Sequence, residues 1–544
     1  MHRPQTPAGL EAEVQPPAPP ARHLSPLTKV RTRGPSGPLR TTGALPVVAA
    51  ALGLAVVLAT VYLALPLSGT DLSAAEAHRD FAARHPLTPI DLRWYGGVNQ
   101  FGYSLLSQLV TVALGSQLAG AVALVVASAL LAHLLVRTGA RRPYLAALAG
   151  AACIAANLVS GRIAYALGVA AALGALDLLL ARRPVLASVA AILTAALSPV
   201  AGLFLGLVAL GLLLRRELRG SALVVGAVTA IVLLVQALLF GDGGTNTISA
   251  KDTRHAVALL LLVAVLVGAR EVRVVALVTA ALTVTLLLVP NPVGLTVMRL
   301  PVMFAIPVLV AFTSRRLVAA AAVLAVLWYQ PPLLTADWHH RGEDVAQRAY
   351  FTPLADQLAA RHPTGRVEVV PTRDYWEAAW IASPDVALAR GWLRQADTRW
   401  NPLFFQGKLT DEAYRAWVLD NAVQYVAVPR THTSWVGARE RKLLAAPPSW
   451  LQLIWEDPNW RLFRVADASS IVAAPGSLSS LSDAELRFDA PQAGRYEVKL
   501  RWSRWLTAGS GVCVRKQGNW TELDVKAPGT VTLTSSLLPA TGCA

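Results

Sequence analysis

The sequence predicts a mainly α-helical membrane protein with about eleven transmembrane helices, followed by a C-terminal region of ordinary soluble composition. Hydrophobic residues make up 54% of the 544 residues and charged residues only 15%, against about 25% charged residues in a soluble globular protein. The deficit of charge is uneven, because residues 43–334 are almost continuously apolar whereas residues 335–544 are not. The two parts are therefore expected to fold in different surroundings, with the boundary near residue 334.

Eleven apolar runs predict the membrane-spanning helices. A helix perpendicular to the bilayer needs ~20 residues to cross it. Several runs are shorter, which suggests helices shielded by their neighbours or a locally thin bilayer. The Ser198-Pro199 step either separates two spans or kinks one. The runs are 44–66, 117–136, 143–159, 162–181, 184–198, 200–214, 221–240, 255–269, 274–290, 298–313 and 317–334.

The charges of the loops predict the orientation, because cytoplasmic loops carry an excess of Lys and Arg. With the N-terminus inside, all five cytoplasmic loops are basic and the opposite loops are mixed in sign. This alternation requires Pro199 to separate two spans, and the odd span count then places residues 335–544 outside the cytoplasm. The basic groups are Arg137/Arg141/Arg142, Arg182/Arg183, Arg215/Arg216/Arg219, Arg270/Arg273 and Arg315/Arg316.

Residues 1–42 hold nine prolines and several basic residues. They lack the apolar side chains that a folded core needs. The segment is also too long and too rich in proline for the basic start of an ordinary signal peptide. We expect a disordered, basic cytoplasmic tail.

The region after residue 334 is expected to form two domains outside the cytoplasm. Residues 335–465 mix helix and strand patterns and predict an α/β domain, with strands at 366–370 and 423–428 and a helix at 411–419. Residues 466–544 alternate in polarity, for example over 494–502 and 529–533, and predict a small β-sandwich. Thirteen of the fifteen Trp lie after residue 334. Because flat rings stack on sugars as well as filling cores, carbohydrate binding is one candidate role for this region.

The cysteines fit an outer location for the C-terminal region. Cys513 and Cys543 both lie there, and an oxidising compartment lets them pair as a disulfide. Unpaired burial is the alternative. Cys153 lies in an apolar run and is expected to be a small core residue.

The outer loop at 67–100 holds the candidate catalytic acids, Asp71 and Asp91. A carboxylate at the membrane surface can act as a general base toward a hydroxyl, or bind a divalent cation. The alternative is a solvated loop that only keeps charge out of the bilayer.

Arginines at the outer ends of spans are the candidate phosphate ligands. Arg299 stands at the start of a late span, where a fixed cation suits a lipid phosphate or pyrophosphate. The alternative is an interfacial arginine that extends its side chain to water. Arg162 and Arg254 have the same two interpretations.

Several function classes are disfavoured by what the sequence lacks. It has no Walker A pattern, no zinc-spaced Cys/His cluster and no Gly-x-Ser-x-Gly elbow. The only acid well inside a span is Asp177, near its cytoplasmic end, whereas ion-coupled transporters carry ionisable groups at mid-membrane. The net charge of +16 is explained by topology, and no groove-reading motif indicates a nucleic-acid partner.

Several segments together resemble the polytopic glycosyltransferases of the C superfamily (GT-C). The first outer loop carries Asp71, His78 and a Trp94-Tyr95-Gly-Gly…Phe-Gly-Tyr103-Ser segment that leads into a helix. Residues 157–168, 197–204 and 297–301 resemble an outer turn, the fifth-to-sixth helix region and a late helix carrying an arginine. Residues 376–401 resemble a family of actinobacterial membrane proteins that often carry the general description membrane protein or MFS transporter.

The resemblance implies an enzyme of the bacterial plasma membrane. It would move a sugar from a polyprenyl-phosphate donor to a cell-envelope glycan on the outer side, with membrane lipid, donor and glycan as its partners. Asp71 would be the base, with Asp91 as the fallback, and Arg299 would hold the donor phosphate. His78, Trp94, Tyr95 and Tyr103 would support the loop. A divalent cation, Mg²⁺ or Mn²⁺, is the one cofactor to consider, and its ligands are unknown.

Two other functions remain open. Leu72 follows Asp71 where better-known enzymes of the superfamily have a second acid. This departure keeps a non-catalytic envelope assembly protein in consideration. A transporter or flippase of an envelope precursor is supported by the many helices, although the two halves show no convincing repeat. The sequence leaves the sugar, the acceptor and the linkage open.

Overall fold

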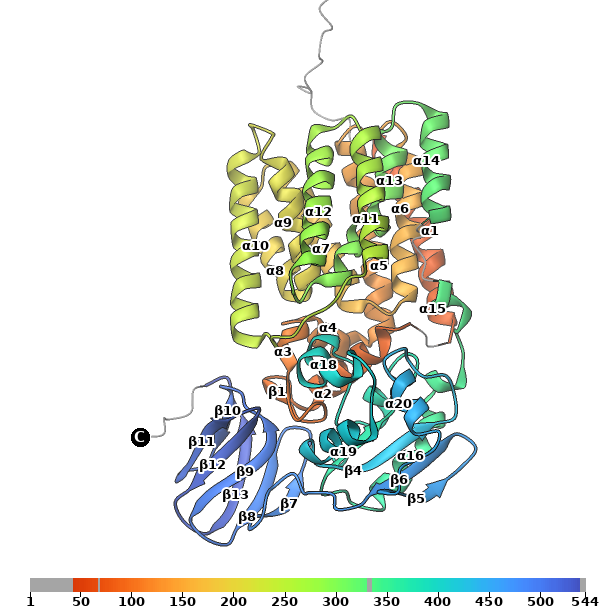
Figure 1. Ribbon diagram of the computed structural model, residues 1–544. Coiled ribbons are helices and arrows are strands. Elements are labelled where there is room, and N and C mark those ends of the chain that lie inside the picture. Colours follow the sequence, from red (N-terminus) through yellow and green to blue (C-terminus); the bar gives the residue numbers. More distant parts are fainter. Residues whose placement is uncertain (1–42, 67–68, 330–334, 539–544) are drawn as a thin grey trace, which may run out of the picture. The chain divides into compact units, whose positions relative to one another are not determined.

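Apolar helices at the eleven predicted positions make up the first half of the computed structural model, which describes residues 43–66, 69–329 and 335–538 (Figure 1). Six of the described helices are long and apolar enough to cross a membrane, and four more apolar helices are shorter. The prediction of a mainly helical, multi-pass membrane protein with a β-rich C-terminal region is confirmed. The helices are α1 (Leu45–Ala64), α5 (Ser116–Arg137), α6 (Pro143–Val159), α7 (Ile163–Leu180), α8 (Pro184–Leu197), α9 (Pro199–Leu212), α10 (Arg219–Phe240), α11 (Ala250–Leu266), α12 (Arg270–Leu288), α13 (Arg299–Phe312) and α14 (Arg316–Tyr329).

The step at Ser198 separates two helices. Ser198 has an extended backbone, and its hydroxyl accepts a hydrogen bond from the Ala201 N–H at 3.3 Å. Pro199 follows as the first residue of α9, where a missing N–H costs no helical hydrogen bond. A Cβ added to Gly202 would lie 3.1 Å from the Cα of Ala195, so α9 folds back against α8. The separation that the charge pattern required is therefore present.

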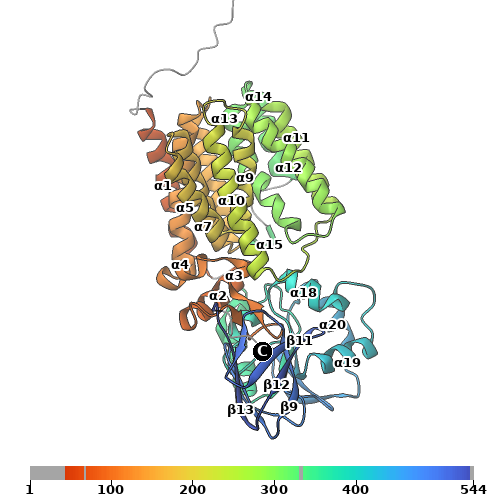
Figure 2. The ribbon, with the colours of Figure 1, turned by 90° about the vertical axis from the view of Figure 1, so that its left-hand side faces the viewer.

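Small side chains allow the helices to approach closely. Helices α1, α5 and α7 lie side by side (Figure 2), and Ala51 and Ala55 of α1 and Ala127 of α5 are fully buried. A Cβ on Gly120 of α5 would lie 2.5 Å from the end of the Leu158 side chain, so a larger residue there would require Leu158 to move. Small residues are the usual means by which helices associate in lipid.

The loops predicted to be cytoplasmic contact one another. Arg142 donates to the carbonyls of Val310 and Thr313 at 3.1 and 3.0 Å. Arg137 pairs with Asp177 at 3.0 Å, and Arg215 pairs with Glu271 at 2.6 Å. Each of these contacts joins two segments that the sequence places on the same side.

The loops predicted to be outside also contact one another. The Asp71 N–H donates to the Ser160 carbonyl at 3.1 Å, and the Leu105 N–H donates to the Ala196 carbonyl at 2.9 Å. The Asn246 N–H donates to the Asn291 carbonyl at 2.8 Å. Figure 1 shows α2, α3, α4 and α18 gathered at this end of the helices. The two sets of loop contacts agree with the alternation of the charge pattern.

The first outer segment is a folded substructure rather than a loop. Helix α2 buries its first turn and, further along, Ala77 and Phe81 on one face, although its sequence is largely polar. A two-stranded antiparallel hairpin and two short helices follow. The elements are α2 (Leu72–Arg84), β1 (Ile90–Asp91), β2 (Val98–Asn99), α3 (Gln100–Tyr103) and α4 (Ser107–Leu114).

A four-stranded mixed sheet, in the order β3-β4-β6-β5, forms the centre of the region after α14. β3 and β4 are parallel, with Val367 opposite Tyr425, and the other pairs are antiparallel. Thr410 caps the predicted helix, since its hydroxyl accepts from the Ala413 N–H at 3.2 Å. The elements are α15 (Thr335–His339), η3 (Asp344–Ala346), α16 (Arg348–Ala359), β3 (Arg366–Val369), α17 (Glu377–Trp380), α18 (Arg394–Trp400), η4 (Pro402–Phe404), α19 (Asp411–Asp420), β4 (Val423–Pro429), α20 (Ala438–Leu443), β5 (Leu451–Glu456) and β6 (Trp460–Val465).

Two antiparallel sheets follow, in the orders β10-β13-β8-β7 and β11-β12-β9. Alternate residues of β9 and β8, such as Tyr496, Val498 and Phe488, are buried between them. Cys513 lies buried in β11, whereas Cys543 and the tail at 1–42 lie outside the described residues, so the disulfide stays a prediction. The strands are β7 (Ser477–Leu481), β8 (Leu486–Ala490), β9 (Gly494–Arg501), β10 (Leu506–Ala508), β11 (Val512–Gln517), β12 (Trp520–Val525) and β13 (Gly529–Ser535).

Candidate active site

Asp71 lies between the end of α1 and the start of α2, and its side chain is only 12% exposed. It holds the position that precedes α2, where an aspartate ordinarily accepts a hydrogen bond from a helix N–H. No such bond forms. Instead Asp71 Oδ2 lies 2.8 Å from Arg299 Nη2 and 3.4 Å from Arg162 Nε. The alternative interpretation, a solvated loop, is wrong for Asp71, because this carboxylate is a nearly buried counterion for two arginines.

The two arginines come from different helices. Arg299 is the first residue of α13, directly after the 3-10 turn η2 (Gly294–Met298), and its guanidinium lies 5.4 Å from the centre of the Tyr165 ring. Arg162 precedes α7, and its Nη1 lies 3.5 Å from Asn157 Oδ1. Two guanidinium groups this close repel each other unless an anion lies between them. The Asp71 carboxylate supplies that anion in the present structure.

Aromatic side chains of the outer segment cover one side of the site. His78 stacks on Tyr103 with ring centres 4.8 Å apart, and Tyr103 meets Trp392 edge-on at 5.9 Å. Trp392 Nε1 donates to the Thr70 carbonyl at 2.8 Å, next to Asp71. Burial lowers the pKa of His78 to about 4 and raises the pKa of Tyr103 above its usual range. Both side chains are therefore neutral near pH 7 and support the loop without adding charge.

Asp91 lies elsewhere in the outer segment. It is fully buried, and its two oxygens face the Arg93 guanidinium at 3.0 and 2.8 Å. Arg93 also donates to the Ala77 carbonyl at 2.7 Å and to Asp80 at 2.9 Å. This geometry gives Asp91 the role of holding the hairpin β1–β2 against α2.

Trp94 and Tyr95 join the outer segment to the α/β region. Trp94 Nε1 donates to the Ala378 carbonyl at 3.3 Å, and the Tyr95 hydroxyl donates to the Gly391 carbonyl at 2.6 Å. Both side chains are buried. Their contacts fix the position of the segment that carries Asp71 and His78.

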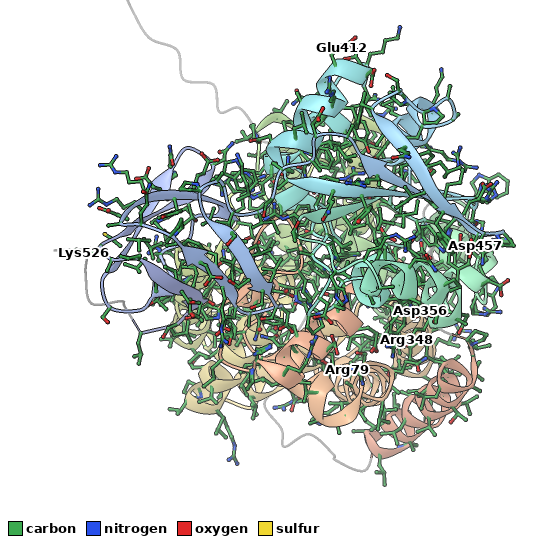
Figure 3. The ribbon with its side chains drawn as sticks, turned by 90° about the horizontal axis from the view of Figure 1, so that it is seen from below. Arg79, Arg348, Asp356, Glu412, Asp457 and Lys526 are labelled. Carbon is green, nitrogen blue, oxygen red and sulfur yellow. The ribbon has the colours of Figure 1, made fainter. Side chains whose placement is uncertain are left out.

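Arg254 is exposed in the first half of α11, and no described contact brings it to Asp71. The structure thus brings together two of the three arginines proposed from the sequence. Glu76, one turn along α2 from Asp71, pairs instead with Arg79 at 3.1 Å. Figure 3 labels Arg79 in the view from below.

The sequence analysis missed Asp337, which lies just after α14. Its side chain is 1% exposed, and it interacts electrostatically with Arg162, Asp71 and Arg373. Burial raises the pKa of Asp337, while Ser160 and Arg162 lower it. A signal was available, because Asp337 follows the last apolar run as closely as Asp71 follows the first.

A metal site cannot be assembled from the side chains in view. Within residues 43–66, 69–329 and 335–538, no three His, Cys, Asp or Glu side chains gather as metal ligands. Asp71 already faces two guanidinium groups, whose charge opposes a divalent cation beside them. We therefore derive no step through a metal.

Comparisons with known proteins find similar solved structures and no match among family models or curated sequences. The arabinofuranosyltransferase AftD from Mycobacteria is 14% identical, with a TM-score of 0.44, over 90% of this chain and 57% of that chain. A mutant of AftD is 15% identical, with a TM-score of 0.43, over 90% of this chain and 60% of that chain. An oligosaccharyltransferase from Archaeoglobus fulgidus is 13% identical, with a TM-score of 0.37, over 72% of this chain and 69% of that chain.

This chain spans less than two thirds of the length of the AftD chains. The TM-scores are all below 0.5, so these likenesses carry no argument about the reaction. The contacts of Asp71 must supply that argument.

Proposed function

We propose that this chain is a membrane-embedded glycosyltransferase of the GT-C type. It moves a sugar from a polyprenyl-phosphate donor to a cell-envelope glycan on the outer side of the plasma membrane. The observation that supports this proposal is the contact of the Asp71 carboxylate with Arg299 and Arg162 at the ends of α1, α13 and α7.

Two converging guanidinium groups suit the phosphate of the donor. Arginine binds phosphate oxygens through paired N–H donors, and such charged hydrogen bonds are about twice as strong as neutral ones. A phosphate that reaches Arg299 and Arg162 replaces Asp71 as their counterion. The same event releases the Asp71 carboxylate next to the bound donor, so donor binding prepares the base.

The sugar then passes from the donor to the acceptor. The acceptor hydroxyl gives its proton to Asp71, and its oxygen bonds to the anomeric carbon of the sugar. The bond between that carbon and the phosphate oxygen breaks, and the electron pair leaves with the polyprenyl phosphate. Arg299 and Arg162 stabilise the charge that develops on the leaving phosphate.

The predicted topology places this chemistry on the outer side. Asp71, Ser160 and Arg299 all belong to segments that the charge pattern puts outside, and they contact one another. A lipid-linked donor with its tail in the bilayer presents its phosphate at this depth. The proposed eleven crossings, with the N-terminus inside, are what this location requires.

The test is deletion of the gene in its host, followed by rescue with variants and linkage analysis of the envelope glycans. Wild type and Glu76→Gln should restore a linkage that the deletion removes, because Glu76 pairs with Arg79 outside the site. Asp71→Asn and Arg299→Ala should not restore it, although immunoblots show them in the membrane at wild-type amounts.

The other outcomes separate the competing functions. A deletion that leaves every linkage unchanged removes the glycosyltransferase proposal. Full rescue by Asp71→Asn would show that Asp71 is not the base, and would favour a transporter or a non-catalytic assembly protein.

A further inference from the structure

Buried polar atoms without a hydrogen-bond partner gather around Asp71. Native proteins pair about nine in ten of their buried polar groups, so a local concentration of unpaired ones calls for an explanation. The atoms in this part of the described chain that make no close hydrogen bond are both oxygens of Asp337, Asp374 Oδ1, Arg373 Nε, Arg162 Nε, Tyr165 OH, Asn157 Nδ2 and His78 Nε2.

These atoms belong to segments that contact one another. Ser73, two residues after Asp71, donates its hydroxyl to the Asp374 carbonyl at 2.7 Å. Arg373 Nη2 lies 3.0 Å from Asp374 Oδ2, which leaves Oδ1 of that carboxylate unpaired. Asp337 interacts electrostatically with Arg373 as well as with Arg162 and Asp71. The segment after α14 and the loop before α17 thus form one wall beside Asp71.

The charges of this region are mixed. Arg299 and Arg162 face Asp71, whereas Asp337 and Asp374 add two carboxylates, with Arg373 Nη2 3.0 Å from Asp374 Oδ2. Burial raises the pKa of Asp374 to about 6, so its carboxylate is mainly ionised near pH 7. The oxygens of Asp337 and Asp374 that make no close hydrogen bond can accept one from a ligand. They therefore suit a ligand rich in hydroxyl donors.

We propose that Asp337 and Asp374 form a subsite that binds the hydroxyl groups of a sugar, next to the phosphate-binding pair Arg162 and Arg299. The subsite rests on the proposed function and adds to it the residues that hold the transferred sugar. Asp337 carries the larger share, because both of its oxygens are buried and make no close hydrogen bond, although the Ser160 hydroxyl interacts with this carboxyl group and lowers its pKa. A neutral sugar whose neighbouring hydroxyls donate to one carboxylate would pair both oxygens at once.

The experiment compares binding with and without a sugar, using the full chain in lipid nanodiscs. The probes are farnesyl phosphate, a panel of farnesyl-phosphoryl pentofuranoses and hexopyranoses, and the matching methyl glycosides. The variants are Asp337→Asn, Asp374→Asn and Arg299→Ala. Asp344→Asn is the matched control, since Asp344 is an exposed acid in the same segment.

Asp337→Asn should leave farnesyl phosphate binding within about twofold of wild type and weaken the preferred farnesyl-phosphoryl sugar by about tenfold or more, the range for a lost charged hydrogen bond. Asp374→Asn should act in the same direction and more weakly. Arg299→Ala should weaken both kinds of probe, and Asp344→Asn neither.

Two results would overturn the subsite. If Asp337→Asn binds every probe as wild type does, the unpaired atoms hold only water and the subsite is wrong, even where farnesyl phosphate binding still supports the proposed function. If wild type binds no sugar-bearing probe better than its sugar-free counterpart, the subsite is also wrong. Failure of the proposed function looks different. Wild type would then not bind farnesyl phosphate, whereas methyl glycoside binding that Asp337→Asn abolishes would still support the subsite.

Discussion

Replacing Asp71 by asparagine should strengthen phosphate binding while it abolishes transfer. In the present structure Asp71 and a donor phosphate compete for the same two guanidinium groups, since Asp71 Oδ2 lies 2.8 Å from Arg299 Nη2. The asparagine has nearly the same shape and no charge. It leaves Arg299 and Arg162 without a counterion, and a bound phosphate then neutralises their positive charge.

The size of the gain follows from the lost contact. A hydrogen bond between charged groups contributes about 1.5–3 kcal/mol. The side chains of Asp71 and Arg299 are 12% and 18% exposed, so solvent screens the pair in part and the lower value applies. Arg162 Nε, at 3.4 Å, contributes less. About 1.5 kcal/mol corresponds to a Kd for farnesyl phosphate lowered about tenfold.

Isothermal titration of nanodisc-embedded protein with farnesyl phosphate measures this change, and a donor–acceptor assay measures transfer. Transfer should fall by about 10²-fold or more, since that is the usual contribution of a general base. Glu76→Gln is the control, because it removes a nearby carboxylate of α2 that pairs with Arg79 rather than with Arg299 or Arg162. Farnesyl phosphate that binds Asp71→Asn no more tightly than wild type would refute the idea that Asp71 and the donor exchange places.

Four further predictions concern stability, topology and the disulfide. Asp91→Asn should cost about 3 kcal/mol of stability in thermal or denaturant unfolding, because it leaves the buried Arg93 without its main partner; normal stability with lost transfer would instead make Asp91 a catalytic acid. Burial raises the pKa of Glu377 to about 7, so ionisation disfavours the folded state increasingly from about pH 4.5 to pH 7. Glu377→Gln should therefore stabilise by up to about 3 kcal/mol at pH 8 and hardly at all at pH 4, and an equal effect at both would contradict the assignment. A cysteine at Lys442 should react with a membrane-impermeant thiol reagent in intact cells, whereas labelling only after lysis would put this region in the cytoplasm. Non-reducing mass spectrometry should find Cys513 linked to Cys543, and two free thiols in protein from its native compartment would refute the pair.

The helices were predictable because each depends on local sequence. The apolar runs, the prolines that begin α6, α8 and α9, and the arginines of the cytoplasmic loops each act within a few residues of where they stand. The strand over 494–502 was predictable for the same reason, since alternate polarity records which face is buried. The strand over 423–428 is a mostly apolar run and is buried along nearly its whole length. The helix α2 was not predictable, because its buried face is made of Ala and Ser as well as Phe81 and Leu72.

The site was only half predictable, because its contacts join distant parts of the chain. Asp71 and Arg299 were found from their places beside spans, but the sequence could not show that they lie 2.8 Å apart, or that the acid is nearly buried. Asp91 looked equally suitable, and only its contact with Arg93 gives it a structural role.

Asp337 shows how a membrane fold brings distant residues of the chain together. The residues just beyond each span that ends on the outer side lie at the same surface, whatever their separation along the chain. Asp71 follows α1, Arg162 precedes α7, Arg299 begins α13 and Asp337 follows α14, and their side chains interact. The ion pairs show which of these residues bind one another, and the atoms without close hydrogen bonds show which remain available to a ligand. Asp71 pairs with two arginines until a phosphate displaces it, whereas both oxygens of Asp337 are buried and make no close hydrogen bond. That difference is why we assign proton transfer to Asp71 and sugar binding to Asp337.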